Sequence, residues 1–420
     1  MYAKLVRNIV IRNASPPKLK IEKSTYHQIQ ASRKFLFPNL MEIYCDGRLE
    51  DVCLLLSPSL RRVVLLEDKI FKFDTPPPAM FTFISALPKI CPDLQSLEVY
   101  LRDLPSSAMR SIQKLQNLQY LGLKFVPSQE SNIKHYTSIS LLPNLRLLQF
   151  SGSRGRWSAP DYPKFHSPEA FCALQQLDFY ASLESIVNWL PSFISPNMTT
   201  FTAEIDATWI DDEEENRFSA KELCYELCDT LAKHARSPSS TLRTLLFISN
   251  SSAVSSTEVE AFQPLLALRG LETLVFDIPL NGFDDSTLIK WARTWSNLKT
   301  FRVEPSSEVY GEDSTITLFG VRELFQLCPD LKSLTLSFDA SELHLVPEIP
   351  TTPSLRHGLK DWDIDVSEVT SATLDPVLAV LNWVFLDMWD VRARRFNLAY
   401  SIASEALPHS LGRVAAKERP

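Results

Sequence analysis

The sequence predicts an α/β solenoid, a stack of short strand–helix units, and two observations predict it. A six-residue phrase, Leu-x-x-Leu-x-Leu, recurs along the 420-residue chain, often directly after Pro-Asn, Pro-Asp or Pro-Ser. Two near copies, residues 91–99 and 328–336, stand far apart in the sequence, and segments of helical periodicity separate the copies. Units this short cannot bury their apolar faces alone, so neighbouring units must stack.

The phrase has 13 copies, each numbered here by the residue that opens it. The opening residues stand at positions 6, 40, 60, 94, 118, 145, 174, 198, 242, 271, 298, 331 and 359. Their intervals run from 20 to 44 residues, and several match the roughly 20–29 residues of leucine-rich repeats. We therefore predict an irregular leucine-rich repeat solenoid, a horseshoe with a parallel sheet on its concave side and helices outside.

Each copy of the phrase predicts one strand. If the opening residue is position 1, positions 4 and 6 alternate as in a strand and point into the core, whereas positions 3, 5 and 7 point outward. Position 1 fills the turn before the strand. The outward positions of all copies together are expected to line the concave surface.

The segments between the phrases predict helices. Ser219 and Glu222 form a capping box that opens a run with Leu223, Leu227 and Leu231 on one face. A second capping box, Thr257 with Glu260, predicts a helix that ends near Leu268. Residues 79–90 and 316–327 are expected to be helices that lead directly into the two Cys-Pro-Asp turns.

The predicted solenoid spans residues 1–365, and residues 366–420 are expected to form a C-terminal helical cap and tail. Within the cap, residues 374–391 predict an amphipathic helix, and residues 392–395 predict a basic turn. The longest interval contains an acidic insertion near residues 206–218. Its acidic run, residues 211–215, is either a solvated insertion or a docking segment for a basic partner.

Composition favours an intracellular protein, cytoplasmic or nuclear. The net charge of −7 argues against nucleic-acid binding. No apolar run reaches the roughly 18 residues of a membrane span, and residues 1–7 lack a signal-peptide core. Seven scattered cysteines are typical of buried thiols in a reducing compartment.

The sequence predicts no enzyme activity, no cofactor and no metal. It lacks the glycine-rich phosphate-binding motifs, and its seven histidines form no metal or catalytic pattern. Cys224 and Cys228 lie four residues apart on a predicted helix, where burial explains them better than a metal does. Residues 361–365 alternate acids with apolar residues but lack the glycine of a calcium loop.

The predicted concave face is biased toward acids, with ten acidic and four basic residues at positions 3, 5 and 7 and with tyrosines between them. We interpret this face as a binding surface for a basic protein segment. The other interpretation, that solenoid faces are simply polar, stays open. The candidate partner-binding residues are Glu98, Tyr100, Tyr120, Asp178, Tyr180, Glu204, Asp277, Glu304, Asp361, Asp363 and Asp365.

The Cys-Pro-Asp-Leu-x-x-Leu-x-Leu/Val phrases resemble the cysteine-containing repeats of F-box proteins. The irregular intervals and the Leu-Pro-Asn-Leu turn at residues 142–145 look like the F-box families of mushroom-forming fungi, and residues 2–11 are similar to the first strand after the F-box there. The resemblance implies the substrate-recognition subunit of an SCF-type ubiquitin ligase, in which the F-box grips the adaptor and the repeats hold the substrate.

The sequence departs from that family at the F-box itself. No stretch like Leu-Pro-x-Glu-Leu-Leu precedes Tyr2 or occurs later. Adaptor binding is therefore expected only if an F-box is restored upstream, and the chain is either truncated or a repeat-only relative. The alternative function is a ligase-independent leucine-rich repeat scaffold or inhibitor that uses the same face.

Overall fold

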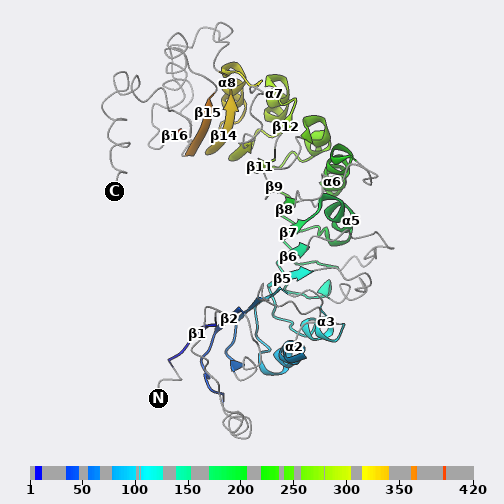
Figure 1. Ribbon diagram of the computed structural model, residues 1–420. Helices are drawn as coiled ribbons and strands as arrows, with labels where there is room; N and C mark the ends of the chain where they lie inside the picture. Colours follow the sequence, from blue (N-terminus) through cyan, green and yellow to red (C-terminus); the bar gives the residue numbers. More distant parts are fainter. Residues whose placement is uncertain are drawn as a thin grey trace, which may run out of the picture. The chain divides into compact units, whose positions relative to one another are not determined.

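The computed structural model divides the chain into two compact units, residues 1–206 (unit 1) and residues 207–420 (unit 2). Each unit is a stack of parallel strands with helices along one side of the strands (Figure 1). The structure describes residues 5–11, 35–46, 55–66, 78–100, 104, 106–125, 139–152, 170–205, 219–235, 241–249, 257–278, 280–303, 315–339, 361–366 and 391–393.

Unit 1 has one sheet, and neighbouring strands follow one another in sequence and pair in parallel. Its described helices are α2 (Pro78–Ile90), α3 (Ser106–Ile112) and α5 (Leu183–Phe193). Its strands are β1 (Asn8–Ile11), β2 (Glu42–Asp46), β3 (Arg62–Leu66), β4 (Ser96–Tyr100), β5 (Tyr120–Phe125), β6 (Leu147–Gly152), β7 (Gln176–Ala181) and β8 (Thr200–Ile205).

Unit 2 repeats this arrangement, and a two-strand pair, β10 (Thr257–Glu258) with β12 (Leu280–Asn281), lies outside its main sheet. Its helical segments are α6 (Ala220–Ala235), the 3₁₀ helix η5 (Val259–Ala267), α7 (Asp285–Thr294) and α8 (Leu318–Leu327). Its main strands are β9 (Thr244–Ser249), β11 (Thr273–Asp277), β13 (Thr300–Val303), β14 (Ser333–Phe338), β15 (Asp361–Val366) and β16 (Val391–Ala393).

The register of the strands confirms the predicted leucine-rich repeat fold. Every one of the 13 phrases is followed by a strand that begins two residues after its opening residue. Position 3 of one phrase pairs with position 3 of the next: Arg62 with Ser96, and Ser96 with Tyr120. The same holds in unit 2, where Thr300 pairs with Ser333. The phrase therefore fixes both the start and the register of each strand.

The backbone carbonyl at position 2 holds neighbouring phrases together. The carbonyl of Arg61 accepts the N–H groups of Gln95 and Ser96, both at 2.9 Å. In unit 2, the carbonyl of Lys299 accepts those of Lys332 at 2.7 Å and Ser333 at 3.0 Å. Strands β2 to β8 of unit 1 and β11, β13 and β14 of unit 2 thus begin by donating two hydrogen bonds to one carbonyl at the start of the strand before.

The core consists of phrase positions 1, 4 and 6. In the two Cys-Pro-Asp phrases these side chains are at most 2% exposed: Leu94, Leu97 and Val99 in unit 1, and Leu331, Leu334 and Leu336 in unit 2. Large aromatic side chains fill the space between repeats. The Trp291 and Trp295 rings, with centroids 5.3 Å apart, are almost fully buried, as their spacing on a helix predicts.

The two predicted capping boxes have different outcomes. Ser219 and Glu222 cap α6 reciprocally: the Ser219 N–H donates to the Glu222 carboxylate at 2.9 Å, and the Glu222 N–H donates to Ser219 Oγ at 3.2 Å. The box at Thr257 is wrong, because Thr257 pairs in β10 and no side chain caps η5. Pro264 lies within η5 and lacks the N–H that a continuous α-helix needs there.

The C-terminal region also differs from the prediction where the structure describes it. Val391–Ala393 form β16, which pairs in parallel with β15, so the expected basic turn at residue 392 is instead a strand. Apolar–polar–apolar alternation of Val391, Arg392 and Ala393 suits the pleat of an edge strand. The predicted cap helix up to residue 390 and the acidic run at residues 211–215 lie outside the described residues, and the last residue of that helix, Val391, begins β16.

Candidate functional site

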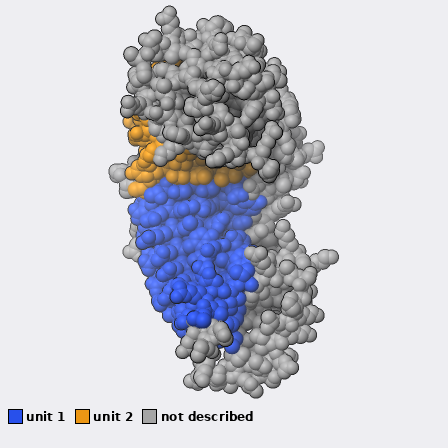
Figure 2. Space-filling view, turned by 90° about the vertical axis from the view of Figure 1, so that its left-hand side faces the viewer, with its two compact units in different colours: residues 1–206 blue, residues 207–420 orange. Residues whose placement is uncertain are grey.

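The side chains at phrase positions 3, 5 and 7 project from the face of the sheet that the helices leave uncovered, here named the open face. In β4, Glu98 and Tyr100 are half-buried and alternate with the fully buried Leu97 and Val99. Figure 2 shows unit 1, in blue, from the side of this face. The strand alternation therefore places the predicted site residues of unit 1 on one surface.

Glu98 is the centre of a polar cluster on this face. Arg62 on β3 donates from Nη2 to Glu98 Oε1 at 3.0 Å, and Tyr100 donates its hydroxyl to Glu98 Oε2 at 3.4 Å. The Glu98 side chain is 13% exposed, whereas that of Arg62 is 52% exposed. A carboxylate so poorly solvated needs such partners, because its desolvation is otherwise uncompensated.

Gly122 makes room for the tyrosine beside this cluster. Its backbone lies in register between Glu98 and Gln149. Tyr120 reaches across it and donates its hydroxyl to Gln149 Oε1 at 2.7 Å. A Cβ atom at residue 122 would lie 3.2 Å from both Glu98 Cγ and Tyr120 Oη. The absence of a Cβ atom at residue 122 therefore eases this close approach of side chains.

Asp178 on β7 continues the polar row beyond Gln149. Gln176 donates its side-chain amide to both Asp178 oxygens, at 3.2 and 3.0 Å. Burial raises the pKa of Asp178, although hydrogen bonds from Thr202 and Gln176 favour the ionised form and oppose this effect. The Asp178 carboxylate thus accepts hydrogen bonds from neutral donors, whereas the Glu98 carboxylate is paired with the cation of Arg62.

The tyrosine hydroxyls are held in their neutral form. Burial, followed by the charge of Glu98 and the hydrogen bond to it, raises the pKa of Tyr100 to about 12. Burial and the charge of Glu98 also raise the pKa of Tyr120, with smaller contributions from Tyr100 and Asp178. Both phenols are therefore hydrogen-bond donors at neutral pH.

The remaining predicted residues are only partly brought together. Tyr180 on β7 and Glu204 on β8 are neighbours in register and half-buried. Asp277, on β11, belongs to unit 2. Asp361, Asp363 and Asp365 occupy alternate positions of β15, opposite Ser333, Thr335 and Ser337 of β14. Glu304 lies outside the described residues.

Sequence reasoning missed the contacts that organise this face. The Arg62–Glu98 pair joins position 3 of one phrase to position 5 of the next, so that the signal was present in the aligned phrases. Gln149 and Gln176 escaped notice because only charged and aromatic residues were counted. Gly122 had a signal too: it is the glycine at a central outward position of a phrase.

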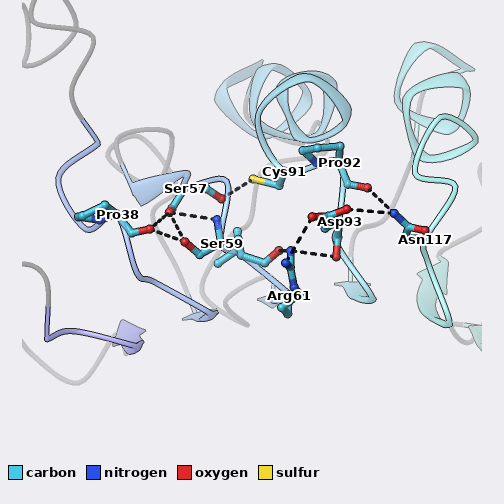
Figure 3. A network of polar contacts seen from close by, with 9 residues as sticks. Pro38, Ser57, Ser59, Arg61, Cys91, Pro92, Asp93 and Asn117 are labelled. Carbon is cyan, nitrogen blue, oxygen red and sulfur yellow. Dashed lines mark hydrogen bonds and ion pairs between the residues drawn. The ribbon is translucent and has the colours of Figure 1, made fainter.

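The Cys-Pro-Asp turns serve the stacking of repeats. Cys91 donates its thiol to the carbonyl of Ser57 in the preceding turn, at 3.2 Å (Figure 3). Cys328 does the same in unit 2, toward the carbonyl of Trp295 at 3.6 Å. Burial raises the pKa of Cys91 to about 11 and that of Cys328 to about 12, so both remain neutral S–H donors.

In several phrases of unit 1, the residue just before the opening residue also bonds to the preceding repeat. Asn117 donates its side-chain amide to the carbonyl of Pro92 at 3.4 Å and to Asp93 Oδ1 at 3.1 Å, and Arg61 lies 3.3 Å from the same Asp93 carboxylate (Figure 3). This explains the recurrent Pro-Asn and Pro-Asp pairs. Side chains at the strand starts of unit 1 therefore hold neighbouring repeats together.

Metal or thiol chemistry has little support in the described part of the chain. Those residues contain no group of three or more His, Cys, Asp or Glu side chains that could hold a metal. Cys224 and Cys228 on α6 are buried, as predicted, and burial raises the pKa of both thiols, that of Cys224 to about 12. Neutral thiols of this kind are poor nucleophiles.

Comparisons with known proteins give no family for this chain. No family model matches the sequence, and no curated protein matches it. The structure is similar to that of an internalin from Listeria monocytogenes, with a TM-score of 0.41 and 12% sequence identity, over 88% of this chain and 94% of that chain. We take the leucine-rich repeat fold from the strand registers and the buried phrase positions. Among the described helices, none has the length and apolarity to cross a membrane.

Proposed function

We propose that this protein is a non-enzymatic binding module that holds a basic segment of another protein on the open face of unit 1. One observation carries the proposal. Carboxylates and tyrosines occupy outward positions of four strands, and each of these side chains is half-buried: Glu98 and Tyr100 on β4, Tyr120 on β5, Asp178 and Tyr180 on β7, and Glu204 on β8. The alternate side chains of the same strands point into the core. Such a surface combines aromatic contact area with charges that select a basic partner.

Within this function, we propose the role of substrate-recognition subunit of an SCF-type ubiquitin ligase. The support is the resemblance of the Cys-Pro-Asp phrases to the repeats of F-box proteins. The partner on the open face is then the protein to be ubiquitinated. A ligase-independent scaffold or inhibitor would use the same face without the ligase adaptor.

The binding role is tested by charge reversal. The triple variant Glu98→Lys, Asp178→Lys and Glu204→Lys is expected to lose capture of the partner from an extract of the source cells, measured by quantitative mass spectrometry. Its charge-matched control reverses three exposed acids on helical segments, Glu184, Glu226 and Glu260, and is expected to retain capture. Unchanged capture by the first variant, if it is folded by circular dichroism, would reject the open face as the site.

Lysine at three half-buried positions can disturb folding, so a second variant carries Glu98→Gln, Asp178→Asn and Glu204→Gln. It removes the same carboxylates with almost no change in volume and should also lose most of the capture. The ligase role has its own readout: the SCF adaptor and cullin should copurify with the tagged endogenous protein. A captured partner without adaptor would overturn the ligase role and favour the scaffold.

A further inference from the structure

The ion pair between Arg62 and Glu98 carries an inference that rests on the proposed function and makes it specific. We propose that Glu98 receives one arginine or lysine side chain of the partner, and that Arg62 holds this place in the free protein. The partner's cation exchanges with Arg62, which swings away on its flexible side chain. The described cluster for this exchange is Arg62, Glu98, Tyr100 and Tyr120, here named the Glu98 cluster.

Glu98 has the properties of a receptor for a cation. It is an acid that keeps only 13% of its side chain exposed, and burial, followed by the negative charge of Glu98, raises the pKa values of Tyr100 and Tyr120. Two tyrosine rings accompany the carboxylate, and a cation gains from both an aromatic face and a charge. The chemistry of the site therefore fits a guanidinium or ammonium group rather than a neutral side chain.

Arg62 is held weakly enough to be exchanged. Its side chain is 52% exposed, and it reaches Glu98 through one nitrogen, Nη2, to one oxygen, Oε1. A bidentate pair would use both oxygens, but here Tyr100 occupies the second one. Because the Arg62 guanidinium is half-exposed, its charge is well solvated, and a single contact to Glu98 adds little net free energy. A partner that supplies its own cation thus loses little by displacing Arg62.

The exchange predicts that removing Arg62 strengthens binding. The probe is a fluorescein-labelled peptide of six Arg-Gly units, and its affinity is measured by fluorescence anisotropy at constant ionic strength. Arg62→Gln should tighten binding about fivefold, because the peptide no longer competes with an internal cation. Arg146→Gln, which removes the same charge from an exposed arginine of unit 1, should change affinity less than about twofold.

A second pair of variants tests the role of the Glu98 carboxylate. Glu98→Gln should weaken binding about tenfold or more, whereas Glu184→Gln, which neutralises an exposed acid on α5 of the same unit, should weaken it less than about twofold. The double variant Arg62→Gln with Glu98→Gln should show no tightening relative to Glu98→Gln. Thermal unfolding of each variant confirms that the comparison is made between folded proteins.

Two results would overturn the exchange. If Arg62→Gln weakens binding, Arg62 itself contacts the partner and is not displaced. If Arg62→Gln and Arg146→Gln behave alike, the affinity reports net charge alone. Neither result touches the proposed function, because that function is tested by capture of the cellular partner with the triple variants. Loss of partner capture together with equal arginine variants would reject the Glu98 exchange and leave the open face as the binding surface.

Discussion

The open faces of the two units carry different side chains at the same phrase position. In unit 1, position 5 of β4 to β8 is mostly polar and carries two acids: Glu98, Gly122, Gln149, Asp178 and Thr202. In unit 2, the same row carries Leu246, Val275, Arg302 and Thr335 on β9, β11, β13 and β14, and its acid, Asp363, comes on β15. The buried positions are nevertheless leucine-like in both units. Burial therefore constrains the residue types at positions 1, 4 and 6, whereas the residue types at positions 3, 5 and 7 can differ with the binding function of each unit.

The units also differ in how side chains join neighbouring repeats at the strand starts. Unit 1 uses neutral amides that donate to carbonyls of the preceding repeat: Asn117 to Pro92, Asn144 to Gln116, and Asn197 to Cys172. Unit 2 uses charges, and Glu272 there pairs with Arg243 at 2.7 Å and Lys299 at 2.5 Å. Neighbouring repeats are thus joined mainly by neutral amides in unit 1, where Arg61 and Asp93 form an additional ion pair, and by the charged group around Glu272 in unit 2.

The largest effect on stability is expected from a methyl group added at Gly320 in unit 2, in contrast to the same change at Gly122 in unit 1. A Cβ atom at Gly320, in the first turn of α8, would lie 2.0 Å from Asp285 Oδ1. That carboxylate accepts the N–H and hydroxyl of Thr317 at 2.8 and 2.6 Å and so holds Thr317, whose hydroxyl oxygen caps α8 by accepting the Phe319 N–H. Gly320→Ala should therefore lower the free energy of unfolding by about 2 kcal/mol, measured by urea denaturation, although alanine favours helices.

Gly122→Ala in unit 1 should cost less than about 1 kcal/mol, because the neighbouring Glu98 and Tyr120 side chains can move by the few tenths of an ångström required. The control is Gly270→Ala, where the added Cβ would lie 3.9 Å from its nearest neighbour, an ordinary contact. Equal costs at residues 122 and 320 would show that the open face of unit 1 is as rigid as the capped helix start.

A smaller effect separates the neutral and ionic edges. Asn144→Ala should lower the free energy of unfolding by about 1 kcal/mol in both low and high salt, because a neutral hydrogen bond is lost. Glu272→Gln in unit 2 should cost at most about 1 kcal/mol at low salt and nearly nothing in 1 M NaCl, where charges are screened. Urea denaturation at the two salt concentrations measures both. A salt-dependent cost for Asn144→Ala would break the contrast.

The smallest expected effect is a spectroscopic one confined to unit 1. Glu98→Gln should lower the pKa of Tyr100 from about 12, because the carboxylate raises it through charge and a hydrogen bond, but burial should keep it above 10. The readout is the 295 nm absorbance of each protein minus that of its Tyr100→Phe counterpart, followed with pH. Asp178→Asn is the matched control: Asp178 contributes to the raised pKa of Tyr120 but is not among the causes at Tyr100.

The same titration has a consequence for stability. Because the pKa of Tyr100 is raised on folding, its neutral form is favoured in the folded state. The resulting stabilisation is fully present below pH 10 and is lost as the pH rises from about 10 toward 12. Tyr100→Phe should flatten this part of the stability profile, and an unchanged profile would contradict the assignment.

The repeats could be predicted from the sequence because the strands follow a strict pattern. Leu94, Leu97 and Val99 each have one chemical requirement, burial, and a period of two satisfies it wherever the phrase occurs. Helix starts were less certain, since a capping pattern is only a local preference. Ser219 caps the start of α6, whereas Thr257 lies in β10 and pairs with β12.

The site was predicted as a face but not as a set of contacts. Alternation places Glu98 and Asp178 outward, and the structure agrees. Counting acids could not show that Glu98 is paired with Arg62 while Asp178 takes neutral donors from Gln176, because such pairs depend on side-chain directions across strands. The face therefore has fewer unpartnered charges than its composition indicates.

The two hydrogen bonds to the position 2 carbonyl set the register of neighbouring strands, whatever the number of residues that connect their phrases. Phrases 20 residues apart (40 to 60) and 34 residues apart (60 to 94) enter the sheet in the same register. The connecting segments can therefore be shortened, lengthened or exchanged in the gene without shifting any strand by a residue. For protein engineering, these segments are natural insertion points for tags or foreign loops, and for evolution they are where new sequence can be tried at little structural cost.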